Sequence, residues 1–456
     1  MRIFHVYYPT RTIVLLLSEA LIVSASFLLA IALVSGQDTF LVLNYEYGTF
    51  KIAALTGITL LCSYYFDLYA PQSISARWEI YFRLLLVLGL LAILLSAMTF
   101  IYPEIALGQY ILPLGLMLLT AALVVWRSAY ERIISSPMFR EHVYVLGDGE
   151  LAHRIAATIR TRKDSGMELI GTGENAKEAV GGKGPRACES GGSGDCKSVD
   201  RVIVAFQDRR DKMPIAELLR LRFEGVVIEE AGTLLERLSG KLQLDQLRPS
   251  SFIYADGFRL RPTQQISRRV ASMCVAAVGM ILFLPLFPIV VALVRLSSPG
   301  PIMFRQTRVG LRNKNFTVLK FRTMIQNAEA TGAAWATNDD PRVTRIGRFM
   351  RKTRLDEVPQ LWNVVRGDMN LVGPRPERPE FVPILSQEMP YYHLRHMIRP
   401  GLTGWAQVRY GYGGTVEETR HKLEFDLYYL KHMSLGLDLL IMFQTVKTIL
   451  RRRGAQ

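Results

Sequence analysis

The first 130 or so residues alternate long apolar runs with short polar connections. The runs cover residues 12–34, 52–68, 84–102 and 111–126. Each is close to the roughly 17 to 25 apolar residues that an α-helix needs to cross the hydrocarbon core of a bilayer. Buried core helices are the alternative interpretation, but four such runs with so few charged residues favour a bundle of transmembrane helices.

Positive charges flank these runs at alternate ends. Lys and Arg are missing from residues 36–47 and from the stretch around Glu104, whereas arginines stand at the other ends of the runs. These arginines are Arg2, Arg11, Arg77, Arg83, Arg127, Arg132 and Arg140. Because cytoplasmic connections carry the excess of Lys and Arg, both ends of the bundle are expected on the cytoplasmic side.

After residue 140 the pattern changes to short apolar segments separated by turns. Strands are predicted at 142–146, 201–205 and 225–228, with helices at 152–160 and 214–223. Strands that alternate with helices are typical of a parallel sheet, so the sequence predicts a small α/β domain of Rossmann type.

A glycine motif, Gly147-Asp-Gly149-Glu-Leu-Ala152, follows the first of these strands. The spacing G-x-G-x-x-A occurs in dinucleotide-binding turns, but the same glycines serve any tight strand-to-helix connection, so no bound nucleotide is inferred from it. Residues 171–198 are rich in Gly, Lys, Glu and Ser and lack apolar periodicity, which predicts a mobile loop.

Another apolar run, residues 270–294, is also long enough to cross a membrane. Pro285 and Pro288 lie inside it, where a missing backbone donor and a ring clash break or kink a helix. Arginines flank it on both sides, namely Arg268, Arg269 and Arg295. Because positive charge at both ends argues against a simple crossing, a re-entrant helix is favoured over a fifth spanning helix with an ordinary kink.

Composition changes this picture in one respect. The chain has 456 residues and a formal net charge of +15 at pH 7, which favours anionic partners such as lipid headgroups, phosphorylated substrates or nucleic acid. Composition by itself does not choose among them. Four cysteines, two of them in apolar runs, predict neither a disulfide framework nor a zinc site; they are Cys62, Cys188, Cys196 and Cys274.

Cations without any acidic neighbour follow the proline-containing run. They are Arg305, Arg308, Arg312, Lys314, Lys320 and Arg322. A solvated surface usually mixes the signs of its charges, so this density favours contacts with phosphate groups of a membrane or of a substrate.

An arginine series then leads to two adjacent carboxylates, Asp356 and Glu357. The series is Arg342, Arg345, Arg348, Arg351 and Arg354, and on a helix its spacing of three makes the arginines wrap around rather than form one stripe. Neighbouring carboxylates on a helix point about 100° apart, so one of them can attack phosphorus while the other holds a metal ion. A helix N-terminus or a surface ion pair is the ordinary alternative for such a pair.

Further along, Arg375 stands between two prolines in Val372-Gly-Pro-Arg-Pro376. The prolines restrict the backbone, and a fixed guanidinium can grip a diphosphate with two hydrogen bonds. An apolar helix is predicted at 435–450, before three arginines, and is expected to lie on or against the membrane.

Taken together, eight sequence strings resemble the bacterial sugar transferase family, in its large form with an added membrane bundle and Rossmann-like domain. They are Ser298-Pro-Gly-Pro301, Phe304-Arg-Gln-Thr-Arg-Val-Gly310, Lys320-Phe-Arg-Thr-Met324, Asp340-Pro-Arg342, Leu355-Asp-Glu357, Val372-Gly-Pro-Arg-Pro376, Pro400-Gly-Leu-Thr-Gly404 and Asp426-Leu-Tyr-Tyr429. Residues 408–413 further resemble the exopolysaccharide branch associated with exosortases. Leu284 departs from the family, in which Ser often precedes the proline that matches Pro285.

The resemblance implies a two-step transfer of a sugar-1-phosphate from a UDP-sugar to a polyprenyl phosphate such as undecaprenyl phosphate. The residue matching Asp356 attacks the sugar-bearing phosphate, UMP leaves, and the lipid phosphate then takes the phosphosugar. Glu357 would bind Mg²⁺, and phosphate contacts are expected from Arg351, Arg375, Arg305, Lys320 and Arg322.

The expected fold is an integral membrane α/β protein of the bacterial cytoplasmic membrane. Its domains are a four-helix transmembrane bundle (1–140), a Rossmann-like cytoplasmic domain (141–262) and a mostly helical catalytic domain with the re-entrant helix (263–456). Membrane lipids are expected partners, nucleic acid is not, and a homodimer stays open. Two alternatives also stay open: a glycosyltransferase that passes only the sugar and releases UDP, and an inactive membrane scaffold.

Overall fold

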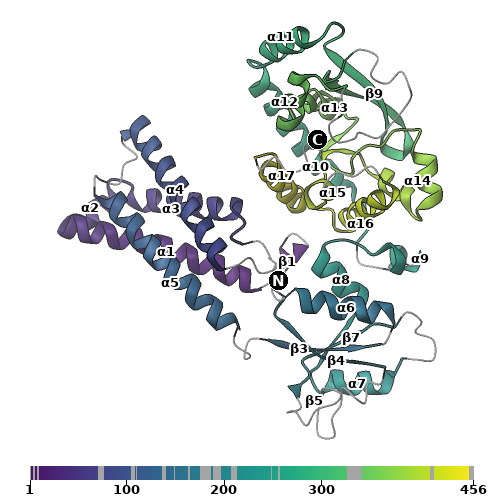
Figure 1. The fold of residues 1–456 in the computed structure, drawn as a ribbon, viewed down its shortest axis with the longest axis horizontal. Coiled ribbons are helices and arrows are strands. Elements are labelled where there is room, and N and C mark those ends of the chain that lie inside the picture. The colour runs from purple at the N-terminus through teal and green to yellow at the C-terminus, as the bar shows by residue number, and fades with distance from the viewer. Residues whose placement is uncertain are drawn as a thin grey trace. The chain divides into compact units, whose positions relative to one another are not determined.

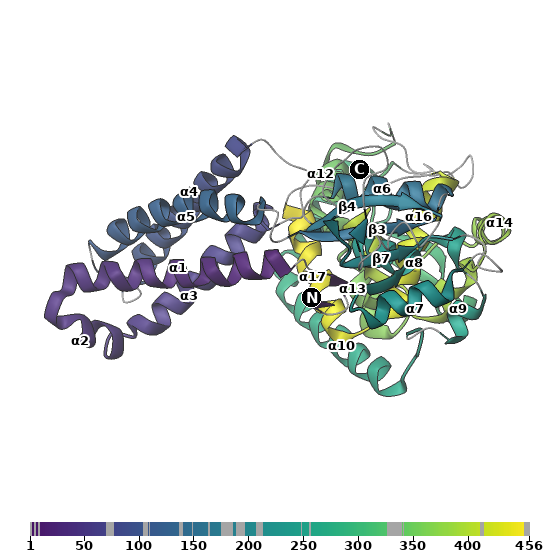
Figure 2. The same ribbon diagram turned by 90° about the horizontal axis from the view of Figure 1, so that it is seen from below.

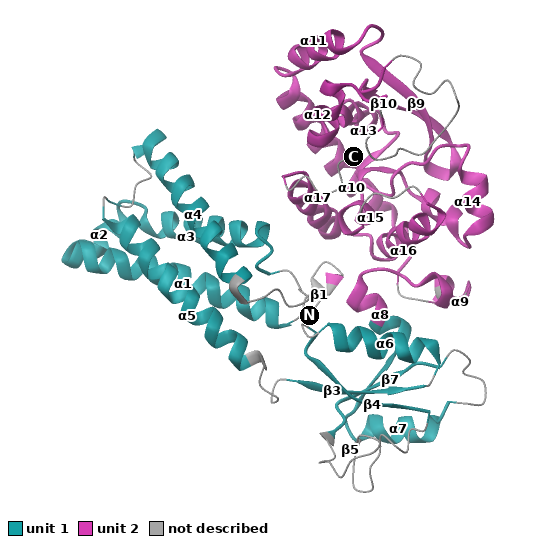
Figure 3. Ribbon diagram, in the orientation of Figure 1, with its two compact units in different colours: residues 1, 8–234 teal, residues 2–7, 235–456 magenta. Residues whose placement is uncertain are grey.

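The computed structural model describes residues 2–3, 6–7, 10–69, 77–103, 108, 110–135, 140–147, 149–162, 165–174, 186–187, 197–206, 213–247, 249–254, 257–325, 340, 342–410 and 415–450. The chain divides into two compact units (Figure 3). One consists mainly of residues 8–234 and the other of residues 235–456 with residues 2–7. Both units have hydrophobic cores of their own.

The first unit contains a bundle of long helices that lie alongside one another in Figures 1 and 2. They are α1 (Thr10–Ser35), α3 (Gly48–Tyr65), α4 (Arg77–Ile101) and α5 (Ile111–Ser135), with the short η1 (Gly36–Asp38) and α2 (Thr39–Asn44) after α1. Val23, Leu55, Leu91 and Leu119 belong to the core that these helices share. All four apolar runs of the N-terminal region are therefore helices, as predicted.

Four helices in the described part of the chain are long and apolar enough to cross a membrane. They are Thr10–Asn44, Glu79–Ile101, Ile111–Ile133 and Pro262–Phe283. α3 is not among them, because its 18 residues include Lys51 and several polar side chains. Three of the four predicted N-terminal spans thus meet the requirement of length and composition, and the fourth such helix belongs to the second unit.

The first unit also contains a four-stranded parallel sheet with the order β4-β3-β7-β8. The strands are β3 (Glu141–Leu146), β4 (Met167–Gly173), β7 (Arg201–Val204) and β8 (Val227–Glu230), and the helices are α6 (Glu150–Thr161), α7 (Ile215–Phe223) and α8 (Ala231–Ser239), the last of which continues into the second unit. In Figures 1 and 2, α6 and α7 lie on opposite sides of the sheet. The alternation of strands and helices was predicted correctly.

β4 was missed, and the prediction of a loop from residue 171 was wrong at its start. Residues 171–173 form the end of β4, where Gly171 pairs with Tyr144 of β3. The glycines hid this strand because it has few apolar side chains; an added Cβ at Gly171 would lie 2.9 Å from the Tyr144 ring. Two short paired strands, β5 (Arg186–Ala187) and β6 (Lys197–Ser198), also fall within the predicted loop, and its other residues from 175 on lie outside the described residues.

The second unit is mostly helical. Its helices are η6 (Leu244–Gln246), α9 (Pro249–Tyr254), α10 (Pro262–Phe283), α11 (Phe287–Ser297), η7 (Leu311–Asn313), α12 (Arg345–Thr353), η8 (Leu355–Glu357), α13 (Gln360–Arg366), α14 (Val382–Glu388), η9 (Tyr392–Met397), α15 (Trp405–Arg409), α16 (Val416–His432) and α17 (Leu435–Leu450). Its strands are β1 (Arg2–Ile3), β2 (Val6–Tyr7), β9 (Met303–Val309), β10 (Asn315–Phe321), β11 (Asn370–Val372) and β12 (Gly401–Thr403).

The apolar run after residue 262 is broken into two helices. α10 ends at Phe283 and α11 begins at Phe287, so the break falls where Pro285 stands. A proline lacks the N–H that would continue the hydrogen-bond ladder, whereas Pro288 fits the first turn of α11 because no intrahelical donor is needed there. Large apolar side chains on both sides of the break are exposed, including Ile281, Leu284 and Ile289.

A β-hairpin supports the centre of this unit. β9 and β10 pair antiparallel from Asn315–Val309 at the turn to Phe321–Met303 at the open end. Phe321 is buried with Val290 and Val294 of α11 and Met350 of α12. The hairpin therefore packs against both α11 and α12. α12 is the helix that precedes the adjacent carboxylates.

Candidate active site

Asp356 and Glu357 lie in η8, a single 3-10 turn between α12 and α13. The chain is helical at this pair, as a 3-10 turn and not as the α-helix for which the 100° separation holds. Arg354 ends α12 in the left-handed backbone conformation, with φ 59°, and this turns the chain before the carboxylates. In a 3-10 turn adjacent side chains still point about 120° apart, so the expected separation of the two carboxylates persists.

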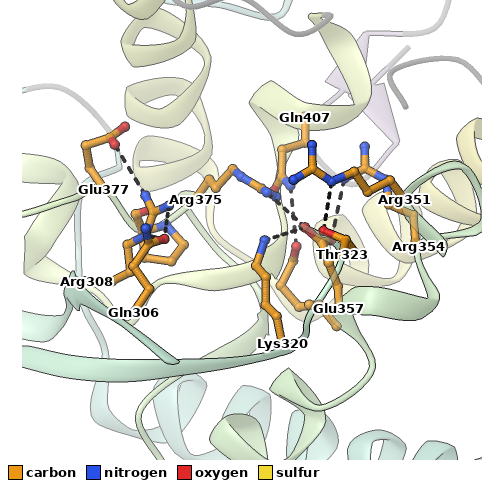
Figure 4. Close-up of polar contacts among 12 residues, drawn as sticks. Gln306, Arg308, Lys320, Thr323, Arg351, Arg354, Glu357, Arg375, Glu377 and Gln407 are labelled. Atoms are coloured by element: carbon orange, nitrogen blue, oxygen red, sulfur yellow. Dashed lines mark hydrogen bonds and ion pairs between the residues drawn. The ribbon is translucent and has the colours of Figure 1, made fainter. Parts of the chain in front are cut away.

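Glu357 is surrounded by cations. Its Oε1 accepts hydrogen bonds from Arg375 Nη2 at 2.9 Å and from Lys320 Nζ at 3.2 Å. Arg354 Nη1 lies 3.5 Å from its Oε2. In Figure 4 the side chains of Lys320, from β10, and Arg375, from the segment after β11, point toward Glu357.

These cations decide the protonation state of Glu357. Burial by itself would raise the pKa of its carboxyl group, but the positive charges of Arg375, Lys320 and Arg354 outweigh burial and hold the pKa well below the usual range. Glu357 is therefore ionised at neutral pH.

Asp356 has a different environment. Its side chain is buried, and its Oδ1 has no hydrogen-bond partner in the described part of the chain. Burial raises the pKa of Asp356 to about 6, and the negative charge of Glu357 acts in the same direction. A buried acceptor without a partner is rare in folded proteins and marks a group that can bind or react with a ligand.

The loop that carries Arg375 is held by hydrogen bonds to three of its backbone carbonyl groups. Tyr429 Oη donates to Val372 O at 3.2 Å, and Arg395 Nη2 donates to Arg375 O at 2.9 Å. Arg308 Nη1 donates to Pro376 O at 3.1 Å. The guanidinium of Arg375 thus reaches Glu357 from a backbone fixed on both sides.

Arg308 and Arg395 were not predicted as site residues. Arg308 belongs to the cation cluster seen in the sequence, and it supports the loop through Pro376 and Glu377 (Figure 4). Arg395 has no distinguishing neighbour in the sequence. Only the fold brings it to the carbonyl of a residue twenty positions earlier.

The β9–β10 hairpin divides the predicted phosphate-binding residues between its faces. Lys320 is paired with Phe304 and faces Glu357, whereas Arg305 is paired with Leu319 and lies on the opposite, exposed face. The structure therefore brings Lys320 to the carboxylates and does not bring Arg305 there.

Arg322 follows the hairpin and is buried. Its Nη2 donates to Ser298 O at 2.5 Å, while its Nε and Nη1 have no partner in the described part of the chain. Buried guanidinium donors without acceptors suit an incoming phosphate oxygen, so the predicted phosphate role of Arg322 stays a prediction that these atoms support.

The arginine series wraps around α12 as its spacing implied. Arg345 and Arg348 are exposed. Arg351 Nε donates to Thr323 Oγ1 at 3.0 Å, on the side of α12 that faces the carboxylate pair (Figure 4). Arg342 precedes the helix and pairs with the buried Asp340, with 2.6 Å between Nη2 and Oδ2.

The described residues contain no group of three or more His, Cys, Asp or Glu side chains that could hold a metal ion. Mg²⁺ does not require such a group, because one or two carboxylates with water and substrate phosphates can complete its coordination. Glu357 is ionised, and the unpartnered Oδ1 of Asp356 belongs to the adjacent residue. The donor set therefore fits Mg²⁺ brought together with a phosphorylated ligand.

The family model described as bacterial sugar transferase matches residues 263–452, which contain all of these side chains. A UDP-glucose:undecaprenyl-phosphate glucose-1-phosphate transferase of Caulobacter vibrioides is 42% identical over 220 residues, covering 48% of this chain and 80% of that protein. The chain belongs to the bacterial sugar transferase family.

Two further relatives match a larger part of this chain. A UDP-N-acetylgalactosamine-undecaprenyl-phosphate N-acetylgalactosaminephosphotransferase of Aeromonas hydrophila is 42% identical over 239 residues, which are 52% of this chain and 56% of that protein. An undecaprenyl-phosphate glucose phosphotransferase of Komagataeibacter xylinus is 31% identical over 355 residues, which are 75% of this chain and 65% of that protein. The chain thus spans less than two thirds of either relative.

Some predictions fall outside the described residues. They concern Cys188, Cys196 and positions 411–413 of the exosortase-like string. Cys62 is buried in the helical bundle and Cys274 is exposed on α10, both as free thiols.

Proposed function

We propose that this sugar transferase moves a sugar-1-phosphate from a UDP-sugar to undecaprenyl phosphate, with Asp356 as the nucleophile. The observation that carries the proposal is the contrast between the two carboxylates. Glu357 is held by Arg375 and Lys320, whereas Asp356 is buried and its Oδ1 has no hydrogen-bond partner within the described ranges. A nucleophile needs such an uncommitted oxygen.

In the first step, an oxygen of the Asp356 carboxylate attacks the sugar-bearing phosphorus of the donor. The new bond is an acyl phosphate, the bond from that phosphorus to the oxygen of the UMP group breaks, and UMP leaves. In the second step, a phosphate oxygen of undecaprenyl phosphate attacks the same phosphorus. The aspartate carboxylate is released, and the lipid carries the sugar through a diphosphate.

The cations around the pair stabilise the charge that builds up on the phosphoryl group in both steps. Arg375 and Lys320 hold the negative charge next to the reacting centre, and Arg351 and Arg322 are proposed to contact phosphate oxygens. Glu357 would hold Mg²⁺, which when bound supplies further charge neutralisation to the phosphates.

The proposed membrane geometry is supported by the contacts of the two arms of the broken apolar run. Arg269, near the start of α10, donates to the carbonyl groups of Val364 and Met369, while Val294 at the far end of α11 packs on Met350. Both ends of the run therefore contact the same domain. This supports a re-entrant helix that enters and leaves on one side, and it is difficult to reconcile with a crossing that separates the two ends.

We propose accordingly that the catalytic domain from residue 263 faces the cytoplasm of a bacterium, beneath the inner membrane. The same proposal includes a Rossmann-like class for the parallel sheet and the three domain boundaries. It also includes a role in exopolysaccharide synthesis and membership of the exosortase-like subgroup. A homodimer remains open.

The decisive experiment identifies the leaving nucleotide and the covalent adduct. Purified full-length protein with Mg²⁺ is incubated with a panel of UDP-sugars, with and without undecaprenyl phosphate, and analysed for nucleotide and for intact protein mass. Without lipid, we expect each protein molecule to release at most one molecule of UMP. The intact mass of the protein should then increase by one hexose phosphate. Lipid then allows turnover.

The matched variants are Asp356→Asn and Glu380→Gln, since Glu380 is an exposed carboxylate of the same domain. Asp356→Asn should abolish adduct and turnover, and Glu380→Gln should keep both. Release of UDP would instead indicate a glycosyltransferase, and absence of both nucleotides with every donor would indicate a scaffold.

A further inference from the structure

A second cluster of cations lies at the turn of the β9–β10 hairpin, away from the carboxylates. It surrounds a pocket of about 310 Å³. The pocket is lined by Gly310, Leu311, Arg312, Lys314, Asn315, Phe316, Gly367, Asp368 and Arg399. Lys320, which binds Glu357, stands four residues after Phe316 on β10, so the nearest pocket-lining residue of this strand is about 14 Å from it. One phosphate group cannot contact both places.

The hairpin turn presents its two cations through an unusual backbone. Arg312 and Asn313 both have left-handed conformations, with φ of 53° and 59°. The turn is closed by Gly310 N donating to Lys314 O at 2.8 Å. The left-handed conformation is uncommon for arginine, whereas asparagine adopts it more readily. Lys314 takes part in this turn through its backbone, and its side chain is exposed.

The opposite wall holds a third cation in place. Arg399 Nε donates to Gly367 O at 3.1 Å, which fixes the guanidinium at the pocket while leaving its two terminal nitrogens for other acceptors. Asp368 is the one carboxylate among the lining residues, and its Oδ2 already accepts from Asn363 Nδ2 at 3.2 Å. Three cations and one partly engaged carboxylate thus line the pocket.

The end of α13 would ordinarily repel an anion here, because helix C-termini expose carbonyl oxygens. Arg269 removes this obstacle. Its guanidinium donates to the carbonyl groups of Val364, Val365 and Met369, at 2.5, 3.0 and 3.1 Å. Because those carbonyl groups already accept hydrogen bonds, the positive charge of the lining residues outweighs their negative partial charge.

We infer that this pocket binds a phosphate group separate from the ones that react at Asp356. A phospholipid headgroup and a free phosphate share this chemistry. The lipid source fits the position of Arg269, since its neighbours on α10, Ile266 and Val270, are exposed apolar residues. The argument for a lipid source rests on the proposed membrane placement of α10. The pocket and its charges are independent of that placement.

Native mass spectrometry of the full-length protein in detergent tests the site without measuring catalysis. The probes are short-chain phosphatidylglycerol, short-chain phosphatidylcholine as the neutral-headgroup control, and inorganic phosphate. Arg312→Gln and Lys314→Gln should each weaken phosphatidylglycerol binding by about three- to tenfold, which is the range for a hydrogen bond to a charged group at a partly exposed site. Asp368→Asn should strengthen binding by about threefold, because it removes a repelling charge.

Lys352→Gln is the matched control, because Lys352 is an exposed cation of the same unit that does not line the pocket. Its effect should stay below about twofold. An equal loss in Lys352→Gln and Arg312→Gln, or a loss in Asp368→Asn, would overturn the inference. The gain in Asp368→Asn also excludes misfolding as the explanation. If inorganic phosphate competes with the lipid, the pocket is a site for free phosphate. If lipid binding depends on the pocket residues and is unaffected by inorganic phosphate, the pocket is a site for a lipid headgroup.

Discussion

Arg395 and Asp426 form an ion pair in which Arg395 Nη2 lies 3.0 Å from Asp426 Oδ2, with the two side chains only 7% and 3% exposed. The same Nη2 donates to the carbonyl oxygen of Arg375 at 2.9 Å. A pair far from the carboxylates in sequence thus fixes the backbone from which Arg375 reaches Glu357.

Asp426→Asn is expected to lower the free energy of unfolding by about 3 to 5 kcal/mol, because it leaves a buried arginine, which cannot give up its proton, without a counter-charge. Thermal unfolding of the full-length protein in detergent measures this effect. Glu417→Gln on the same helix removes a carboxylate that is 71% exposed and should change stability by less than about 0.5 kcal/mol. Equal melting temperatures of Asp426→Asn and wild type would contradict the structural role.

Formation of the proposed adduct should increase with pH through about 6, the value to which burial and the charge of Glu357 raise the pKa of Asp356. The sign follows from the chemistry, because only the ionised carboxylate attacks and it is protonated below that pH. Lys320 lowers this pKa, so Lys320→Gln should move the midpoint to higher pH. Intact-mass measurement of the adduct rate against pH tests both expectations, and a midpoint that stays below pH 5 would count against them.

Arg354 combines a strained backbone with a functional side chain, and two substitutions separate the roles. Arg354→Gly should be more stable than Arg354→Ala by about 1 kcal/mol, because glycine adopts a φ of 59° without strain. Both variants should lose adduct formation to a similar extent, since both remove the charge next to Glu357. Melting temperatures measure the first effect and intact mass the second. Equal stability of the two variants would show that the backbone is not strained.

Gly347 allows α12 to lie close to the segment after β10. A Cβ at this position would come within 2.0 Å of the carbonyl oxygen of Thr323, whose side chain holds Arg351. Gly347→Ala should therefore destabilise the protein by about 1 to 3 kcal/mol and reduce adduct formation. Gly89→Ala, in a helix of the first unit with nothing within 4 Å of the added Cβ, is the control and should not destabilise. Comparable melting temperatures would refute the close contact.

Local patterns predicted the elements well where a single period or residue type dominates. Apolar runs predicted the bundle helices, Pro285 predicted the break between α10 and α11, and alternating segments predicted three strands of the parallel sheet. β4 was missed because Gly171 and Gly173 replace the apolar side chains that mark a strand. The 3-10 turn at Asp356 and Glu357 was not predicted, because the left-handed Arg354 has no signature in the sequence.

The sequence by itself determined which groups the site contains, since two adjacent carboxylates, a dense run of cations and a proline-flanked arginine are local features. It also determined the family, through the order and spacing of its motifs. Only the tertiary structure decided which cations contact which carboxylate. Pairing in the hairpin turns Lys320 toward Glu357 and Arg305 away, and burial leaves Asp356 Oδ1 without a hydrogen-bond partner among the described residues. These outcomes depend on packing between segments far apart in the chain, and a residue's neighbours in sequence do not specify that packing.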